Sequence, residues 1–163
     1  MLKNFDTLDH QTFMKEALIE AEKAGIRGDR PIGSVIIHNG VIIARGANSI
    51  ETADSNVAHA EINTINKNAS YLRKHARECI IYSTVEPCVM CLSTIVMANI
   101  RNIVFAVEDK YMDMEPFIAS NPYIKQRVHN YVGGVLEDES IDILKRYSPE
   151  AAEVVLHGQR NSK

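Results

Sequence analysis

The sequence predicts an α/β fold of three layers, in which a five-stranded mixed sheet lies between two layers of helices. Short apolar segments of strand character alternate along the chain with segments whose apolar residues recur every three or four positions, as in helices. An Asn-Gly pair joins the first two strand-like segments, which indicates an antiparallel hairpin. Beyond the hairpin, strands alternate with helices, so we expect parallel pairing in that half of the sheet.

The first elements are a helix and the hairpin. Apolar residues from Phe13 to Ala21 keep helical spacing and predict a helix from about Asp9 to Ala24 that ends before Gly25. The two strands of the hairpin are expected at Ser34 to His38 and Val41 to Ala47, around Asn39-Gly40.

A second helix is expected to begin near Val57, because apolar residues follow at helical spacing. This buried stripe consists of Ala58, Ile62, Ile65, Ala69 and Leu72. The later elements are expected, in chain order, at Cys79 to Thr84 (strand), Cys88 to Ala98 (helix), Asn102 to Val107 (strand), around Arg127 to Val132 (strand) and Glu139 to Tyr147 (helix).

Length and composition predict one domain over residues 1–163. Of these residues 45% are hydrophobic and 24% charged, which suits a soluble domain with a substantial core. We expect the core at about 9–147 and a tail at about 148–163 that is partly disordered or closes over a neighbouring subunit. No apolar run approaches the roughly 18 residues of a membrane span, and the N-terminus lacks an apolar secretion signal. A cytoplasmic protein without membrane association is therefore expected, and the three cysteines fit a reducing compartment.

The charge of the chain argues against a general attraction to nucleic acid. The formal net charge is −3, and residues 138–163 contain four Lys or Arg against five Asp or Glu. A small basic cluster at Arg73, Lys74 and Arg77 is more typical of a helix end, where it complements the helix dipole. A protein of this composition that acts on tRNA would need a local basic surface.

Two short motifs contain the residues with metal chemistry. His59-Ala60-Glu61 stands at the start of one predicted helix, and Pro87-Cys88-Val89-Met90-Cys91 stands at the start of the next. His59, Cys88 and Cys91 offer one imidazole and two thiolates, which are three zinc ligands and leave a fourth position open, as in catalytic sites. The combination of H-x-E with P-C-x-x-C is the mark of zinc-dependent deaminases. We therefore predict one Zn²⁺ per chain.

Glu61 is the candidate catalytic residue. Residues two apart in a helix point about 200° from each other, so His59 and Glu61 converge only around a helix start. Pro87 suits the first turn of the following helix, and helix N-termini stabilise thiolates. The zinc would polarise a bound water, whose proton Glu61 would take and pass to the substrate. Alternatively, Glu61 only makes a charge–dipole contact in the first helical turn.

Other interpretations of the cysteines stay open. Cys88 and Cys91 have the spacing of a redox dithiol, but the upstream His-x-Glu would then have no role. The zinc would be structural if a fourth side chain closed the site, and the local candidates are Cys79 and His75. Cys79 is otherwise expected to be a buried apolar residue. The remaining histidines show no metal spacing and receive no role: His10, His38, His75, His129 and His157.

With these motifs the chain resembles the cytidine and deoxycytidylate deaminase superfamily, and within it the branch of guanine deaminases and tRNA adenosine deaminases. The resemblance covers about Asp9 to Tyr147 and includes three further segments: Pro31-Ile32-Gly33-Ser34, Gly46-Ala47-Asn48 and Thr84-Val85-Glu86. It implies a cytidine-deaminase-like fold and a homodimer. It also implies that Asn48 contacts the substrate and that the backbone at Ala60 and Pro87, beside the metal ligands, helps to hold it. Without the resemblance, Asn48 would be interpreted as a turn residue.

The function expected from these residues is the zinc-dependent hydrolytic removal of the exocyclic amine from a free nucleobase or nucleoside, with release of ammonia. A purine such as guanine is favoured slightly over cytosine or cytidine, because the segments around Asn48 and Cys88 resemble the guanine branch more. The alternative is a tRNA-specific adenosine deaminase that forms inosine in the anticodon loop. A lesser alternative is a non-catalytic, zinc-stabilised interaction module.

The pocket is expected beyond the carboxyl ends of the strands, because both metal motifs fall at strand-to-helix junctions. A stretch rich in aromatic residues and methionine offers a far wall that could stack on a planar base. It consists of Tyr111, Met112, Met114, Phe117 and Tyr123. The same stretch is equally well interpreted as a surface loop that packs on the sheet edge or on a second subunit.

Overall fold

The computed structural model describes residues 2–160. The strands are β1 (Gly33–His38), β2 (Val41–Ala47), β3 (Cys79–Val85), β4 (Asn102–Val107) and β5 (Asn130–Val132). The α-helices are α1 (His10–Arg27), α2 (Ala60–Lys67), α3 (Ala69–His75), α4 (Val89–Met97), α5 (Met114–Ser120), α6 (Pro122–Arg127), α7 (Glu137–Tyr147) and α8 (Pro149–His157). Two short 3-10 helices are η1 (Phe5–Thr7) and η2 (Ala76–Glu78).

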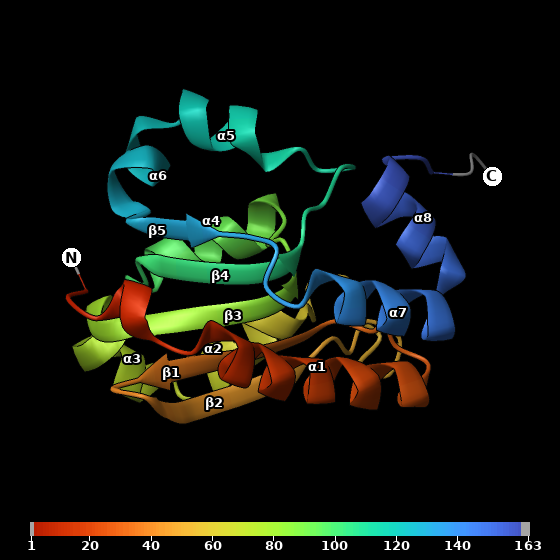
Figure 1. Cartoon of the computed structure of the whole chain (residues 1–163), viewed down its shortest axis with the longest axis horizontal. Helices are drawn as coiled ribbons and strands as arrows, with labels where there is room; N and C mark the ends of the chain where they lie inside the picture. Colours follow the sequence, from red (N-terminus) through yellow and green to blue (C-terminus); the bar gives the residue numbers. More distant parts are fainter. Residues whose placement is uncertain (1, 161–163) are drawn as a thin grey trace.

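The strands form one mixed sheet in the order β2-β1-β3-β4-β5 (Figure 1). Strand β1 pairs antiparallel with β2 and with β3, whereas β3, β4 and β5 pair in parallel. The predicted five-stranded mixed sheet is therefore confirmed. The parallel half brings the carboxyl ends of β3 and β4 to one edge, which is where ligand sites of open α/β sheets form.

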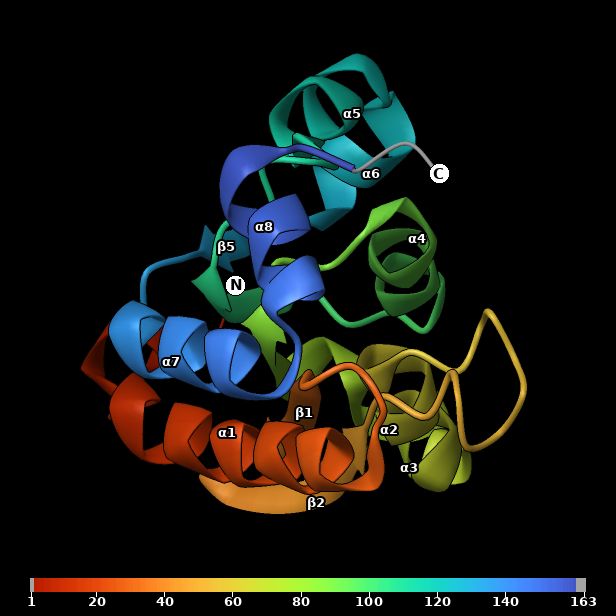
Figure 2. The same ribbon diagram turned by 90° about the vertical axis from the view of Figure 1, so that its right-hand side faces the viewer.

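Helices cover both faces of the sheet. Helices α1, α7 and α8 pack with Ile37 and Ile80 on one face, and α2, α3 and α4 pack with Ile36 and Ile81 on the other. Because successive side chains of a strand point to opposite faces, β1 and β3 are buried at every position. Figure 2 shows the two helical layers, with α8 lying across the end of the sheet where β3 and β4 terminate. Between residues 2 and 160, no helix combines the length and the apolar character that a bilayer crossing needs.

The first helix extends beyond its expected end. The prediction ended it before Gly25, but α1 continues to Arg27 and is capped by Gly28, whose φ is 89°. Gly25 serves packing instead, because a Cβ at that position would collide with the ring of Tyr147 on α7. Gly25, which allows close contact between α1 and α7, was therefore mistaken for the end of a helix.

The hairpin between β1 and β2 forms as predicted. Asn39 and Gly40 both have positive φ, at 51° and 76°, as a type I′ turn requires. Two other glycines let helices approach this part of the sheet closely. A Cβ on Gly33 would meet the backbone of α1, and a Cβ on Gly46 would meet Thr64 of α2.

The second predicted helix is two helices. It was expected to begin near Val57, with one apolar stripe that reaches Leu72, but α2 begins at Ala60 and ends at Lys67, and α3 begins at Ala69. Asn68 lies at the break, where its side-chain Nδ2 donates a hydrogen bond to the Ile43 carbonyl of β2. An Asn side chain that bonds to a neighbouring backbone competes with helix continuation.

The C-terminal third is more helical than expected. Helices α5 and α6 occupy the stretch before β5 that was predicted to be irregular, and β5 shortens to Asn130–Val132. The tail is also ordered as far as it is described, since α8 follows α7 after Ser148. Ser148 caps α8 by accepting a hydrogen bond from Ala151 N, and Pro149 occupies the first turn. The expectation of a partly disordered tail was therefore wrong for residues 149–157.

Candidate functional site

The two metal motifs meet at the edge where β3 ends. His59 immediately precedes α2 and Cys88 immediately precedes α4, and both have extended backbone rather than helical backbone. Cys91 lies in the first turn of α4 and is fully buried. Because His59 lies outside the helix and Glu61 lies inside it, the two side chains reach the same site, as the sequence predicted for a helix start.

The three candidate ligands lie at the distances that zinc needs. His59 Nδ1 is 3.4 Å from Cys91 Sγ and 3.6 Å from Cys88 Sγ. The ligand atoms of all three residues lie within 4.8 Å of one another. A tetrahedral zinc with usual Zn–N and Zn–S bonds would separate its nitrogen and sulfur ligands by about 3.6 Å. The donor set and its spacing therefore fit a zinc ion.

The surroundings favour a thiolate at Cys88. The hydrogen bond from the Cys91 thiol and the contact with His59 together lower the pKa of Cys88 to about 4, against the opposing effect of burial. The hydrogen bond with Cys88 and burial raise the pKa of Cys91. A thiolate is the form of cysteine that binds metal, so Cys88 is already in its ligand form at neutral pH.

Glu61 is buried at the base of this site, with 4% of its surface exposed. Burial raises the pKa of its carboxyl group above the ordinary value, and a hydrogen bond from Ser83 opposes that rise. Ser83 Oγ donates this bond to Glu61 Oε1 at 2.7 Å. A carboxyl group with a raised pKa holds a proton more readily than an ordinary carboxyl group, which suits a proton carrier.

Sequence reasoning missed Ser83. It lies on β3, a strand that is buried at all seven positions and is otherwise mainly apolar. A polar side chain in such a strand normally has a hydrogen-bond partner, and that rule was the available signal. The partner itself could not be read from the sequence, because Glu61 lies 22 positions away.

The predicted substrate contacts do not all reach the cavity. Asn48 and Ala60 line it, but Pro87 is not among its lining residues. Asn48 is 1% exposed, and its Oδ1 accepts a hydrogen bond from Ile50 N.

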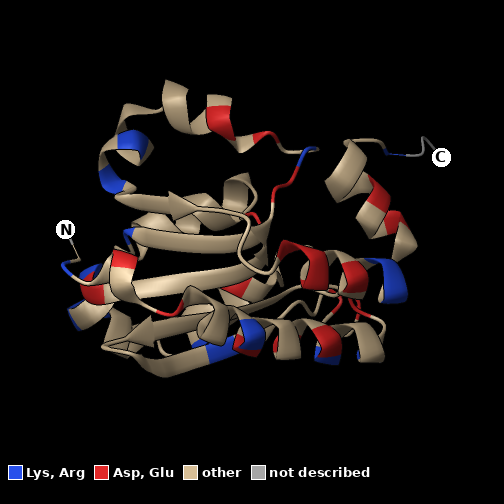
Figure 3. Cartoon of the chain, viewed as in Figure 1, with Lys and Arg blue, Asp and Glu red and all other residues tan. Residues whose placement is uncertain are grey.

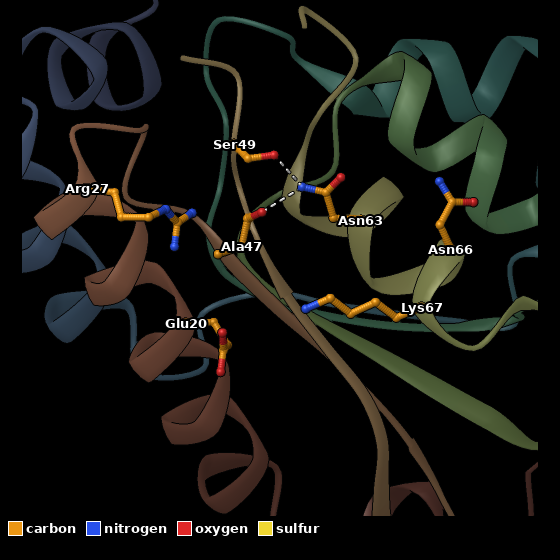
Figure 4. A pocket seen from close by; sticks show the side chains of 7 residues that line it. All are labelled: Glu20, Arg27, Ala47, Ser49, Asn63, Asn66 and Lys67. Carbon is orange, nitrogen blue, oxygen red and sulfur yellow. Dashed lines mark hydrogen bonds between the residues drawn. The ribbon is translucent and has the colours of Figure 1, made fainter. Parts of the chain in front are cut away.

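Polar side chains brace the loop that carries Asn48. Arg27 donates a hydrogen bond to the Asn48 carbonyl at 2.8 Å. Asn63 Nδ2 donates to the Ala47 carbonyl at 2.8 Å and to Ser49 Oγ at 3.0 Å, as Figure 4 shows. These bonds lie in a separate hollow of about 500 Å³ behind the loop, between α1 and α2. Arg27 and Asn63 therefore stabilise the loop that carries Asn48, and the residues that line this hollow support the functional site.

The cavity over the metal group has a volume of about 650 Å³, which is in the range of small-molecule sites. Helix α8 forms one wall through Val154 and Val155. Of the five residues expected in the far wall, only Tyr111 and Met112 line the cavity. The others are placed elsewhere: Met114 and Phe117 pack in the core, and Tyr123 is 46% exposed beneath the Arg127 guanidinium.

Among the charged side chains that line the cavity, acidic groups outnumber basic groups. Six carboxylates face two guanidinium groups: Asp29, Glu51, Glu61, Glu86, Asp109 and Glu150 against Arg30 and Arg160. Figure 3 shows acidic residues on the loop after β4 and on α7 and α8, around the same end of the sheet. This excess of carboxylates makes the cavity less favourable for phosphate than for amino groups.

The residues proposed as a fourth zinc ligand lie elsewhere. Cys79 opens β3, whereas Cys88 follows the opposite end of that strand, and His75 ends α3 beside Cys79. The Cys79 Sγ donates a hydrogen bond to the His75 carbonyl and is buried, as predicted for an apolar cysteine. Among residues 2–160, neither belongs to the metal-binding group of His59, Cys88 and Cys91.

Comparison with known proteins identifies a family. The cytidine and deoxycytidylate deaminase zinc-binding region matches residues 7–107. A tRNA-specific adenosine deaminase of Bacillus subtilis is 35% identical over 144 residues, which are 86% of this chain and 89% of that protein. A guanine deaminase of the same organism is 39% identical over 105 residues, which are 62% of this chain and 66% of that protein.

A solved structure agrees with these relatives. A chain from a study of A-to-I editing by tRNA:A34 deaminases at the wobble position superimposes with a TM-score of 0.70 and 33% identity, and the match covers 83% of this chain and 100% of that one. Some relatives are much larger: a chloroplastic tRNA(adenine(34)) deaminase of Arabidopsis thaliana is 38% identical over 103 residues, which are 63% of this chain but only 8% of that protein.

Proposed function

The chain belongs to the cytidine and deoxycytidylate deaminase family through its zinc-binding region, and from that premise we propose that it hydrolyses the exocyclic amine of a nucleobase and releases ammonia. The observation that carries this proposal is the buried carboxylate of Glu61 beside the group of His59, Cys88 and Cys91, at the base of one cavity. The three ligands leave one coordination position of a tetrahedral ion for solvent.

Each of these residues has a proposed role. His59, Cys88 and Cys91 hold the zinc, which when bound activates a water molecule for attack on the amine-bearing ring carbon. Glu61 accepts one proton of that water and delivers it to a ring nitrogen; it then takes the second proton, from the hydroxyl group added to the ring carbon, and delivers it to the departing amine, which leaves as ammonia. Ser83 holds Oε1 of Glu61 through its hydrogen bond, so that the other carboxylate oxygen faces the reacting atoms.

Asn48 and Ala60 are proposed to hold the substrate. Asn48 lines the cavity, and we propose its side-chain amide nitrogen as a donor for a ring carbonyl or ring nitrogen. The backbone N–H of Ala60, the first residue of α2, has no partner within its helix. Pro87 has no backbone N–H, so its proposed contact is limited to its carbonyl oxygen.

The shape of the cavity supports a small substrate, namely a free nucleobase or nucleoside. Its volume of about 650 Å³ fits a planar base, and α8 closes one side of it. The acidic lining offers acceptors to amino groups and little attraction to a phosphate backbone. A purine such as guanine is the preferred candidate, in line with the similarity to a guanine deaminase.

The second candidate substrate is an adenosine in the anticodon loop of tRNA. The comparisons support it at least as well as the free base, because the tRNA-specific relative aligns over 86% of this chain and the guanine deaminase over 62%. A base in a tRNA loop would have to be splayed out to enter the cavity. We propose a homodimer in either case.

A substrate panel tests the proposal. Ammonia release is measured with guanine, cytosine, adenine, their nucleosides and an unmodified tRNA transcript. Turnover of a free base or nucleoside supports the first candidate, and conversion of adenosine to inosine in the tRNA supports the second. Tight, salt-sensitive tRNA binding would also favour the second candidate. A zinc-loaded protein that releases ammonia from none of these would contradict the proposed activity and favour the non-catalytic module.

A further inference from the structure

Three residues without a sequence-predicted role meet at the opposite end of the sheet from the cavity. His38 ends β1, His75 ends α3, and Glu78 ends η2 just before β3. His38 pairs with Cys79, at the first position of β3, whereas the candidate zinc site follows the last position of that strand. The length of β3 separates the two places by about 20 Å, at roughly 3.3 Å per residue.

The side chains converge as metal ligands do. One ligand atom from each of His38, His75 and Glu78 lies within 4.8 Å of the other two. His38 Nε2 is 3.0 Å from Glu78 Oε2. A nitrogen and an oxygen bound to the same zinc-sized cation lie about 2.9 to 3.4 Å apart, in octahedral or tetrahedral geometry. The ring centroids of His38 and His75 are 5.1 Å apart, so the two imidazoles lie beside each other.

A second hydrogen bond orients the central ligand. His38 Nδ1 lies 2.7 Å from the Tyr71 hydroxyl, which leaves Nε2 directed at Glu78. Metal-binding histidines commonly use their other ring nitrogen in this way, because the bond fixes the ring and its tautomer. His38 is 7% exposed and held in place, whereas the Glu78 side chain is 63% exposed and accessible to ions in solution.

We propose that His38, His75 and Glu78 form a second metal site that binds a divalent transition-metal ion such as Ni²⁺ or Zn²⁺. Two imidazole nitrogens and one carboxylate oxygen suit these ions, whereas Ca²⁺ and Mg²⁺ require more oxygen ligands. The bound ion joins the end of β1 to α3 and η2. Its position far from the cavity makes it a structural cross-link rather than a part of the reaction.

The competing explanation is a plain hydrogen bond from His38 to Glu78 with no ion. The test titrates Ni²⁺ into tag-free protein that contains one zinc ion per chain, as verified by metal analysis, and it measures bound nickel after desalting. We expect one additional nickel ion per chain in the parent protein and none in His75→Ala. No nickel uptake by the parent, or equal uptake by His75→Ala, overturns the proposal.

Two further variants allow the proposal to be tested even if His75→Ala does not fold. Glu78→Gln changes an exposed side chain, so it folds even if His75→Ala does not, and it should weaken nickel binding by at least about 10-fold. If Glu78→Gln binds nickel as tightly as the parent, the proposed site is wrong. The matched control is His157→Ala, which removes an exposed histidine 3.9 Å from Glu153 and should leave nickel binding unchanged.

Discussion

At the scale of single residues, Glu61 carries the proposed proton transfers. Replacing it in Glu61→Gln keeps the size of the side chain but removes the base. We expect turnover to fall by about 10²- to 10⁴-fold while zinc content stays at the parent level. Steady-state kinetics and metal analysis measure the two quantities. Glu153→Gln, which changes an exposed carboxylate on α8, is the control, and parent-like turnover in Glu61→Gln would falsify the proton assignment.

The hydrogen bond from Ser83 is predicted to position Glu61 for that transfer. Ser83→Ala leaves a buried carboxylate oxygen without its donor, so we expect a lower kcat, little change in KM and unchanged zinc content. Ser83→Thr keeps a hydroxyl and should restore most of kcat. Ser34→Ala is the matched control, because Ser34 lies opposite Ser83 on β1 and its buried hydroxyl has no hydrogen-bond partner among residues 2–160. If both alanine variants lower kcat equally, Ser83 has no positioning role.

At the scale of elements, helix α8 decides the size of the cavity. Its Val154 and Val155 form one wall, and the Val155 carbonyl accepts a hydrogen bond from Lys110 N in the loop after β4. The helix ends at Gly158, whose φ is 66°. The size of the cavity should therefore depend on how stably α8 is held in place.

A pair of glycine variants tests this dependence. Gly158→Ala strains the end of α8, and Gly40→Ala strains the hairpin turn, where φ is 76°. Each should lower the free energy of unfolding by about 1 to 2 kcal/mol, as measured by denaturant titration. Only Gly158→Ala should raise KM for the accepted base, since Gly40 is far from the cavity. Equal KM values in the two variants would show that α8 does not bound the substrate.

At the scale of the whole molecule, zinc is expected to tie the helical layer to the sheet edge. His59 precedes α2 and the cysteines begin α4, so one ion joins segments that are far apart in the sequence. A ligand at about 1,000 times its Kd adds roughly 4 kcal/mol to the free energy of unfolding, which corresponds to a Tm about 8 to 16 °C higher.

Metal removal tests this contribution. Chelation of the Glu78→Gln protein, which isolates the first site, should lower Tm by that amount in a thermal melt followed by circular dichroism. His59→Ala in the same Glu78→Gln background is the control, and its Tm should respond little to the chelator. A chelated protein that melts at the holoprotein temperature after metal analysis shows no zinc would contradict the stabilising role.

The sequence by itself determined the chemistry and the order of the main elements. The ligand types and Glu61 are set by short motifs, and zinc coordination depends on residue type more than on detail of the fold. The Asn39-Gly40 turn and the strand at Asn102–Val107 were predicted at their observed positions, because turn chemistry and apolar periodicity are local properties.

Only the tertiary structure decided what depends on contacts between distant segments. Gly25 continues α1 because Tyr147 packs against it, and Asn68 ends α2 because it bonds to Ile43 of β2. Three further features also depend on contacts between distant segments. They are the wall that α8 contributes to the cavity, the hydrogen bond from Ser83 to Glu61 and the hydrogen bond between His38 and Glu78. Each feature joins residues that are far apart in the sequence, and no periodic pattern in the sequence links them. Tertiary packing, and not local conformational preference, therefore brings them together.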